Sequence, residues 1–239
     1  MRFLKSVIGA GLLAIGLALP AQAVSLGQVD TFEDGTTQGW ITALLGSPNP
    51  APPVNVPTGG PAGVDDNFLL LTSLGGNGPG SRLSAINTAQ WAGNYLAAGI
   101  NSLCLDVNNL GNTELALRLM FADPVGGPPT NLAFTDALLV PAGSGWTHLT
   151  FLIDPAHLIP GLGDITTALT NTTELRLYHS PAPNFPNPVF PIPAVTAQLG
   201  VDNIQAQAVP EVPPGMLLSL GLGVLPLLKR RTPRWARRR

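Results

Sequence analysis

Five polar side chains lie on strand-like segments of this 239-residue sequence and could together form a binding surface. In residues 102–107, 114–121, 146–153 and 174–178, apolar residues recur with the two-residue period of a half-buried β-strand. The apolar positions would face the core, and the alternate positions would face outward. These outward positions include Arg118, Arg176, Tyr178, His148 and Asp106.

If those strands are neighbours, the five side chains form a ridge of hydrogen-bonding groups suited to a glycan. Glycan binding also needs an exposed aromatic ring, and aromatic residues make up only 6% of the chain. Trp40 and Trp146 each follow a glycine at a strand start, which favours packing at the edge of the core. The alternative for Arg118 and Arg176 is a surface ion pair with a nearby carboxylate.

Sequence patterns of catalysis are missing. The chain has no GxSxG, no HExxH and no paired cysteines, and its histidines, His148, His157 and His179, are scattered. We therefore expect a protein that is not an enzyme. A polysaccharide hydrolase or lyase remains the alternative, because two carboxylates across a cleft leave no signature in a sequence.

About ten short strands must position these residues, and frequent turns separate them. The other strand candidates are residues 28–32, 39–44, 67–73, 81–87, 136–140 and 197–206. Short helices are expected at 88–95 and at 164–171, the second capped by Asp164, and Pro-rich loops at 47–63 and 181–193. Many short alternating strands predict an all-β fold, a β-sandwich of jelly-roll type.

Both ends of the chain differ from its middle. Arg2 and Lys5, an uncharged apolar run, and the small residues Ala21 and Ala23 are typical of a signal peptide at 1–23, cleaved by signal peptidase after Ala23. Residues 216–228 are apolar and precede seven Lys and Arg. A helix there spans about 20 Å at ~1.5 Å per residue, short for a bilayer core of about 30 Å.

Residues 24–208 form the predicted β-sandwich domain. They hold 13 Asp and Glu against three Arg, a formal net charge of −10. Nucleic-acid binders are basic, so we expect no nucleic-acid partner. One cysteine, Cys104, allows no internal disulfide.

Val209, Pro210 and Glu211, followed by the apolar run and the Arg cluster, resemble a PEP-CTERM sorting signal over residues 209–239. Val212 stands where that family usually has proline. The resemblance implies an exported bacterial protein, inserted briefly in the inner membrane by its C-terminal helix and processed by an exosortase. The alternative is a plain C-terminal membrane anchor.

The segments TFEDGTTQGW (31–40) and LGVDNIQA (199–206) resemble the first and last strands of galactose-binding-like jelly-rolls, the fold of many carbohydrate-binding modules. That resemblance implies that the first and last strands pair. It also implies a structural Ca²⁺ bound by Glu33 and Asp202, with Asp30 and Asp66 as further candidates; calcium favours such clustered oxygen ligands. The alternative is that these carboxylates are solvated turn residues.

These observations predict a non-catalytic protein of the cell surface or extracellular matrix, associated with exopolysaccharide. The alternatives are a carbohydrate-binding module with a defined glycan ligand, and the hydrolase or lyase named above.

Overall fold

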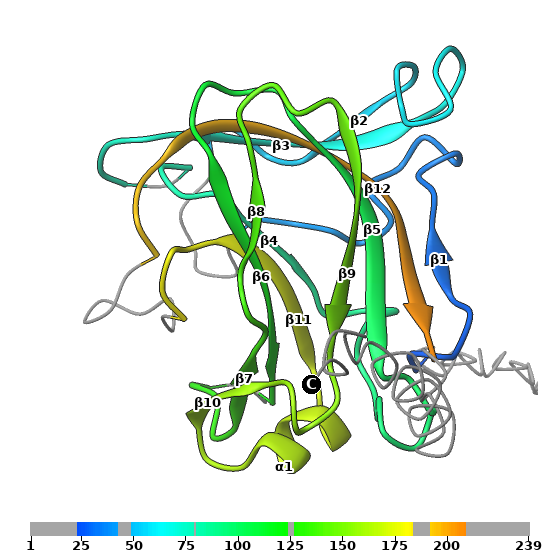
Figure 1. Cartoon of the computed structure of the whole chain (residues 1–239), viewed down its shortest axis with the longest axis vertical. Helices are drawn as coiled ribbons and strands as arrows, with labels where there is room; N and C mark the ends of the chain where they lie inside the picture. Colours follow the sequence, from blue (N-terminus) through cyan, green and yellow to red (C-terminus); the bar gives the residue numbers. More distant parts are fainter. Residues whose placement is uncertain (1–22, 43–48, 79, 124–126, 184–191, 209–239) are drawn as a thin grey trace, which may run out of the picture.

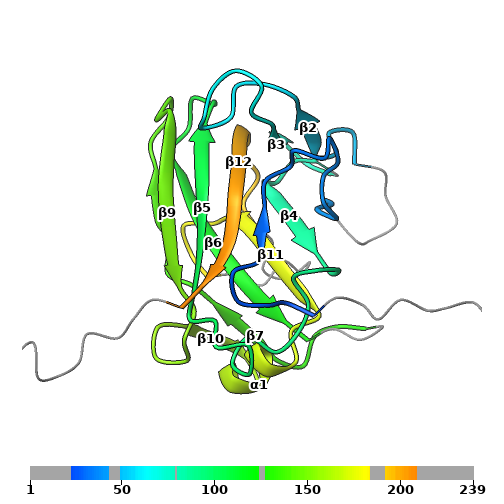
Figure 2. The same cartoon turned by 90° about the vertical axis from the view of Figure 1, so that its right-hand side faces the viewer.

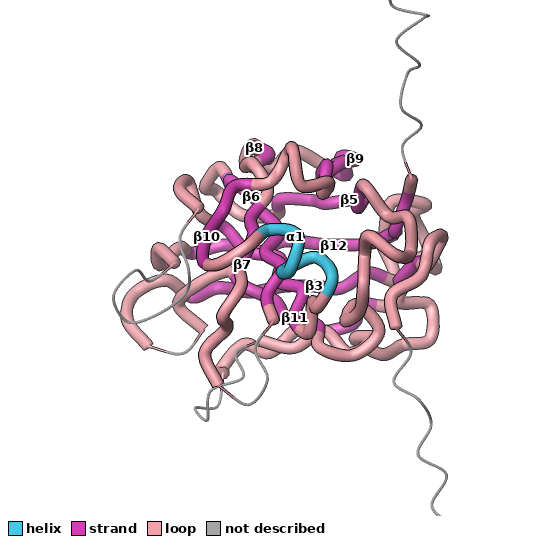
Figure 3. Tube along the Cα trace, turned by 90° about the horizontal axis from the view of Figure 1, so that it is seen from below, coloured by secondary structure: helices cyan, strands magenta, loops and turns pink. Residues whose placement is uncertain are grey.

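Two antiparallel sheets of six strands each face one another and enclose the core (Figure 1). This computed structural model describes residues 23–42, 49–78, 80–123, 127–183 and 192–208. Within those ranges the only helix is α1 (Ile165–Thr170), which lies across one end of the sandwich (Figure 3). The predicted all-β sandwich is therefore confirmed.

Sheet A has the strand order β2, β3, β12, β5, β9, and β1 also pairs with β12. Sheet B has the order β10, β7, β6, β11, β4, and β8 also pairs with β6. The strands of sheet A are β1 (Val29–Asp30), β2 (Val54–Val56), β3 (Phe68–Leu74), β5 (Ser102–Asn109), β9 (Trp146–Leu152) and β12 (Thr196–Gln207). Those of sheet B are β4 (Ser84–Asn87), β6 (Leu115–Ala122), β7 (Leu132–Phe134), β8 (Leu138–Val140), β10 (Ile159–Leu162) and β11 (Glu174–His179).

The core lies between the two sheets, where the apolar members of the alternating segments meet. The predicted inward positions of β5, β6, β9 and β11 are all buried there, because a strand presents every second side chain to the same face. They are Leu103, Leu105, Val107, Leu115, Leu117, Leu119, Phe121, Leu149, Phe151, Leu175 and Leu177.

The outer faces of the two sheets are covered to different extents. On sheet B, a second apolar cluster that includes Met120, Phe134, Tyr178 and Ile192 is buried, with Ile159 packed against it. Every residue of β6 is consequently buried. Figure 2 shows the outer face of β9, β5 and β12, and no described strand or helix lies across it. In the described part of the chain, sheet A therefore presents the broader strand surface to solvent.

The first and last strands pair, as the jelly-roll resemblance implied. On one side, β12 pairs with β3 over its first half and with β1 over its second half. Between the two halves, at Asp202 and Asn203, the register with β5 shifts, and Asn203 takes a left-handed φ of 49°. This β-bulge marks the place where β12 changes neighbours.

A buried carboxylate ties β1 to two distant segments. Oδ2 of Asp30 accepts hydrogen bonds from the indole nitrogens of Trp40 at 2.8 Å and Trp91 at 2.7 Å. Both rings and the carboxylate lie in the interior. Burial raises the pKa of Asp30, while hydrogen bonds from Trp91, Trp40 and Gln90 oppose that rise. Asp30 is thus an anchor within the core, and its carboxylate is engaged in the fold.

The two expected helices have different outcomes. Asp164 caps α1 by accepting the backbone N–H of Thr167 at 2.7 Å, as predicted. The prediction of a short helix at 88–95 is wrong, since those residues form turns. Gly93, at φ 144°, approaches Val24 so closely that a Cβ there would lie 3.0 Å from the nitrogen of Val24. Within the expected loop 47–63, the short strand β2 forms against β3.

The predictions for the two ends fall outside the described residues. These are the signal peptide before Ala23 and the sorting motif Val209, Pro210, Glu211 with its apolar helix and basic tail. In the part of the chain that the structure describes, no helix is long and apolar enough to cross a membrane.

Removing the Asp30 carboxylate should destabilise the fold strongly. Asp30→Ala leaves two buried indole N–H groups without acceptors, at about 1–3 kcal/mol each. We expect the free energy of unfolding, measured by denaturant titration, to fall by about 3 kcal/mol. Asp34→Ala removes an exposed carboxylate from the turn that follows β1; it is the control and should cost less than about 1 kcal/mol. Equal losses in the two variants would contradict the anchor role.

Candidate functional site

The five predicted ligand-binding residues lie on two different faces. Arg118, Arg176 and Tyr178 belong to β6 and β11 of sheet B, while Asp106 and His148 belong to β5 and β9 of sheet A. The expectation of one shared ridge is therefore wrong. Each residue does point away from the core of its own sheet, but β5 and β9 pair with β12 and not with β6 or β11.

On sheet B, the two arginines bond within the protein. Arg118 is buried and donates to the carbonyl oxygens of Ser180 at 2.9 Å, Thr135 at 2.8 Å and Pro181 at 3.1 Å. Arg176 forms an ion pair with Glu174 at 2.6 Å, the alternative named above, although this pair is largely buried. Neither guanidinium is free for a ligand.

Tyr178 is also buried on sheet B, with its ring set edge-on to Phe134 at 6.3 Å. Burial raises its pKa far above the ordinary value for tyrosine. Its hydroxyl and that of Ser84, its cross-strand neighbour, find no hydrogen-bond partner among the described residues. This part of sheet B is closed over by the second apolar cluster.

On sheet A, Asp106 and His148 face each other across β5 and β9 and remain accessible. His148 Nδ1 lies 2.8 Å from Asp106 Oδ1, and Asn203 Nδ2 donates to Asp106 Oδ2 at 2.9 Å. Asn203 reaches Asp106 from the bulge of β12. The carboxylate is thus held from both sides at the middle of the open face.

An aromatic pair lies beside this polar row. Trp146 is partly exposed and donates its indole N–H to the carbonyl of Gly59 at 2.9 Å. Its ring meets Phe68 edge-on, with centroids 5.4 Å apart. The ring reaches across the sheet over Gly200 of β12, where a Cβ would lie 3.0 Å from Trp146 and 3.3 Å from Phe68. Glycine at 200 therefore allows the two rings to lie on the sheet; we call this pair the platform.

The sequence interpretation missed the platform. It placed Trp40 and Trp146 alike at the core edge, which holds for Trp40, a buried residue. The available signal was Gly200 inside an alternating strand, because a strand glycine often marks a close approach by another group.

A second polar row continues across the open face. Cys104 Sγ lies 3.4 Å from Thr150 Oγ1 and 3.3 Å from Gln207 Oε1, and Gln207 Nε2 donates to Gln205 Oε1 at 2.7 Å. Neutral hydroxyl and amide groups thus flank the Asp106 row on the side away from the platform. Such groups can exchange their bonds for those of a sugar hydroxyl.

The predicted metal ligands lie in three different settings. Asp30 is engaged by the two indoles described above. Glu33 accepts the backbone N–H of Asn67 at 2.9 Å, and Asp66 accepts that of Ala62 at 2.5 Å. Asp202 is buried at the bulge. Among the described residues, no three His, Cys, Asp or Glu side chains are grouped so that they could hold a metal ion.

The pKa of Asp202 nevertheless depends on the neighbouring negative charges. Burial raises its pKa to about 7, and the charges of Asp66, Asp106 and Glu33 add to the rise, while the backbone N–H of Asn203 opposes it. A cation would relieve this repulsion, so the residues fit a structural Ca²⁺ in charge. Calcium at Glu33 and Asp202 stays a prediction.

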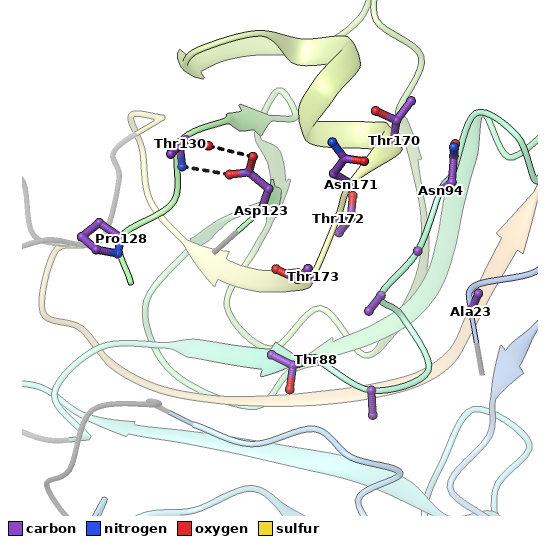
Figure 4. Close-up of a pocket in the computed structure, with 13 residues that line it drawn as sticks. Ala23, Thr88, Asn94, Asp123, Pro128, Thr130, Thr170, Asn171, Thr172 and Thr173 are labelled. Atoms are coloured by element: carbon purple, nitrogen blue, oxygen red, sulfur yellow. Dashed lines mark hydrogen bonds between the residues drawn. The ribbon is translucent and has the colours of Figure 1, made fainter. Parts of the chain in front are cut away.

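A cavity of about 720 Å³ opens near α1 (Figure 4). Hydroxyl and amide side chains such as Thr88, Asn94 and Asn171 line much of it. The oxygens of Asp123 already accept hydrogen bonds from Thr130 and Asn131. None of the lining residues is aromatic. The cavity could hold a small polar molecule, but it offers no ring for a sugar to stack on.

The sequence matches no family model and no curated protein. Solved structures share its fold. An exo-beta-agarase overlaps 81% of this chain with a TM-score of 0.55 at 14% identity, and the overlap spans only 27% of the agarase chain. At that identity the likeness shows the fold alone.

Two carbohydrate-binding modules overlap less well. The family 11 module from Clostridium thermocellum, solved with a β-1,3-1,4-mixed-linked tetrasaccharide, has a TM-score of 0.46 at 14% identity and covers 80% of this chain and 100% of its own. A family 28 module specific for non-crystalline cellulose has a TM-score of 0.42 at 14% identity, with 79% and 99% covered.

The charge of Asp202 should make stability depend on pH. Its carboxyl binds a proton more tightly in the folded protein than in the unfolded chain, where its pKa is 3.8. The stabilisation is complete below pH 4 and is lost as the pH rises through about 7. With chelator present, we expect Asp202→Asn to melt a few degrees above wild type at pH 8 and close to it at pH 4.

The quantity to follow is the difference in Tm between Asp202→Asn and wild type as a function of pH, because the titration of the buried His179 contributes equally to both proteins. A difference in Tm that stays constant from pH 4 to 8 would contradict the predicted role of Asp202. Adding Ca²⁺ at pH 8 tests the metal prediction: a rise in wild-type Tm that Glu33→Gln abolishes supports it, and no rise refutes it.

Proposed function

We propose that this chain is an exported, non-catalytic protein that binds polysaccharide through the outer face of sheet A. The single observation that carries the proposal is the partly exposed ring of Trp146, packed edge-on against the buried Phe68 on an open sheet beside rows of polar side chains. Sugar rings stack on aromatic faces, and their hydroxyls exchange hydrogen bonds with nearby amides, hydroxyls and carboxylates.

The shape of the face suits a long ligand. Strands β9, β5 and β12 lie side by side there, and their outward residues form parallel rows in register: Trp146 with Asn108 and Gly200, then His148 with Asp106 and Asp202. A polymer chain could contact several rows at once. The fold likeness to part of an exo-beta-agarase supports polysaccharide as the ligand class.

Binding without turnover is the better proposal for this face. A glycosidase places two carboxyl groups across the bond that it breaks. Here Asp202 is buried at the bulge, and both oxygens of Asp106 are engaged by His148 and Asn203. The open surface also does little to exclude water from a reacting bond.

Export is proposed from the termini. Signal peptidase would cleave after Ala23, and the new first residue would be Val24. Cleavage would turn the backbone N–H of Val24 into an ammonium, which can still donate to the carbonyl of Ala92, 2.9 Å away. Ala23, which cleavage would remove, is exposed and lies outside the described core. An exosortase would then process the tail beyond Glu211 at the membrane, placing the domain at the cell surface or outside the cell.

Processing predicts the mass of the mature protein. When the full chain is expressed in a bacterium that has an exosortase, we expect N-terminal sequencing to begin at Val24, and mass spectrometry to show that the basic tail is gone. Glu211→Ala should leave the N-terminus unchanged and keep the tail. An intact C-terminus on the mature wild-type protein would refute sorting by cleavage.

The platform predicts the effect of Trp146→Ala on polysaccharide binding. The purified protein would be run in native gels containing mixed-linkage β-glucan, agarose, hydroxyethyl cellulose or chitosan. We expect retardation by at least one polymer, and Trp146→Ala should weaken it at least about tenfold, because stacking on an aromatic ring is lost. Gly200→Val, which pushes both rings off the sheet, should act in the same direction.

Two matched variants distinguish the platform from the other surfaces of the domain. Leu139→Ala removes an exposed apolar side chain on sheet B, and Asn94→Ala alters the cavity near α1. Both should bind as wild type does. Loss of binding in Asn94→Ala with retention in Trp146→Ala would move the site to the cavity and overturn the proposal, provided that melting curves show each variant folded.

A further inference from the structure

The charges of sheet A narrow the class of polysaccharide that its outer face accepts; this step rests on the proposed function. The six strands of the sheet contain no Lys, Arg or Glu. Their ionisable side chains, apart from Cys104, are Asp30, Asp106, Asp202 and His148, and Asp30 points into the core. The face itself therefore carries carboxylates and a single imidazole.

The three arginines of residues 24–208 do not offset these charges at the platform. Arg118 and Arg176 lie on sheet B, bonded as described above. Arg82 precedes β4, also in sheet B, and its Nε donates to the carbonyl of Ile192. An anionic polymer that approaches sheet A would meet the carboxylate of Asp106 with no Lys or Arg on the six strands to offset its charge, and like charges across an interface disfavour binding.

Asp106 is the carboxylate best placed to meet a ligand. Its side chain retains 20% exposure, whereas Asp202 is buried. It lies one row from Trp146 on the same face, a diagonal cross-strand position about 7 Å apart. The contacts with His148 and Asn203 fix its orientation, yet a carboxylate has four lone-pair sites and can accept further donors.

We propose that the face selects polysaccharides bearing free amino groups over acidic ones, and that Asp106 is the residue that makes the distinction. A hexosamine unit stacked on Trp146 would bring its ammonium within reach of the Asp106 carboxylate. The charge-assisted hydrogen bond favours that ammonium, and the negative face of the indole attracts it as well. A uronate unit in the same position would be repelled.

The test compares four oligosaccharides of equal length by isothermal titration calorimetry with the purified full-length protein. They are hexamers of β-1,4-glucosamine, β-1,4-N-acetylglucosamine, β-1,4-glucose and β-1,4-mannuronate. We expect the glucosamine hexamer to bind about tenfold more tightly than the two neutral hexamers, and the mannuronate hexamer to bind least. Raising the salt concentration should reduce the preference for the glucosamine hexamer over the neutral hexamers, because screening weakens exposed charge pairs.

Substitutions at Asp106 isolate its role. Asp106→Asn keeps the size of the side chain but removes its charge, so the preference for glucosamine over the two neutral hexamers should disappear. Asp106→Lys should reverse the order and favour mannuronate. Leu139→Ala, an exposed position on sheet B, is the control and should preserve the wild-type order.

The outcomes separate this inference from the proposed function. If neutral and amino hexamers bind equally, or if mannuronate binds most tightly, the selectivity is refuted while polysaccharide binding stands. If none of the hexamers and none of the gel polymers binds, both are refuted. Selectivity that survives in Asp106→Asn would contradict the role of Asp106 alone.

Discussion

The buried carboxylate of Asp30 is the constraint on which the arrangement of sheet A depends. One oxygen atom accepts two indole N–H groups, from residues 10 and 61 positions further along the chain. A charged group in the interior is costly unless its partners are fixed, so Trp40 and Trp91 must both be in place for β1 to stay in the sheet. Beside β1, β12 makes its bulge, and the bulge presents Asn203 to Asp106 on the open face. The buried Asp30 thus helps to position Asn203 and Asp106 on the outer face of sheet A.

The difference between the two outer faces is the reason why we place the proposed binding surface on sheet A and not on sheet B. On sheet B, the guanidinium of Arg118 donates to three carbonyl oxygens of the protein, and apolar residues pack around Tyr178. No described strand or helix covers the outer face of β9, β5 and β12 (Figure 2). The indole of Trp146 lies over Gly200 of β12 instead of entering the core. A single absent side chain, at Gly200, makes that geometry possible.

Local patterns predicted local features well. Alternation identified the inward face of β5, β6, β9 and β11, because it records which side of each strand meets solvent. Asp164 was recognisable as a helix cap because an Asp side chain accepts the free backbone N–H groups of the first helical turn just after it. Which strands pair over long distances in the sequence cannot be predicted from such local patterns. Nothing in the sequence around Arg118 or Asp106 indicates that their strands belong to opposite sheets, and the ridge prediction failed there. The role of Asp30 was equally hidden, since both of its partners are distant tryptophans.

The position of β12 has a consequence for the order of folding events during the export that we propose. This strand is the last one in the described residues, and it hydrogen-bonds to β1, β3 and β5 in the middle of sheet A. Until residues 196–207 are available, the first-made strands have no central partner and their apolar faces cannot close over the core. Under the proposed export, this order disfavours premature folding on the inner side of the membrane, because the sandwich would be complete only after nearly the whole domain had emerged.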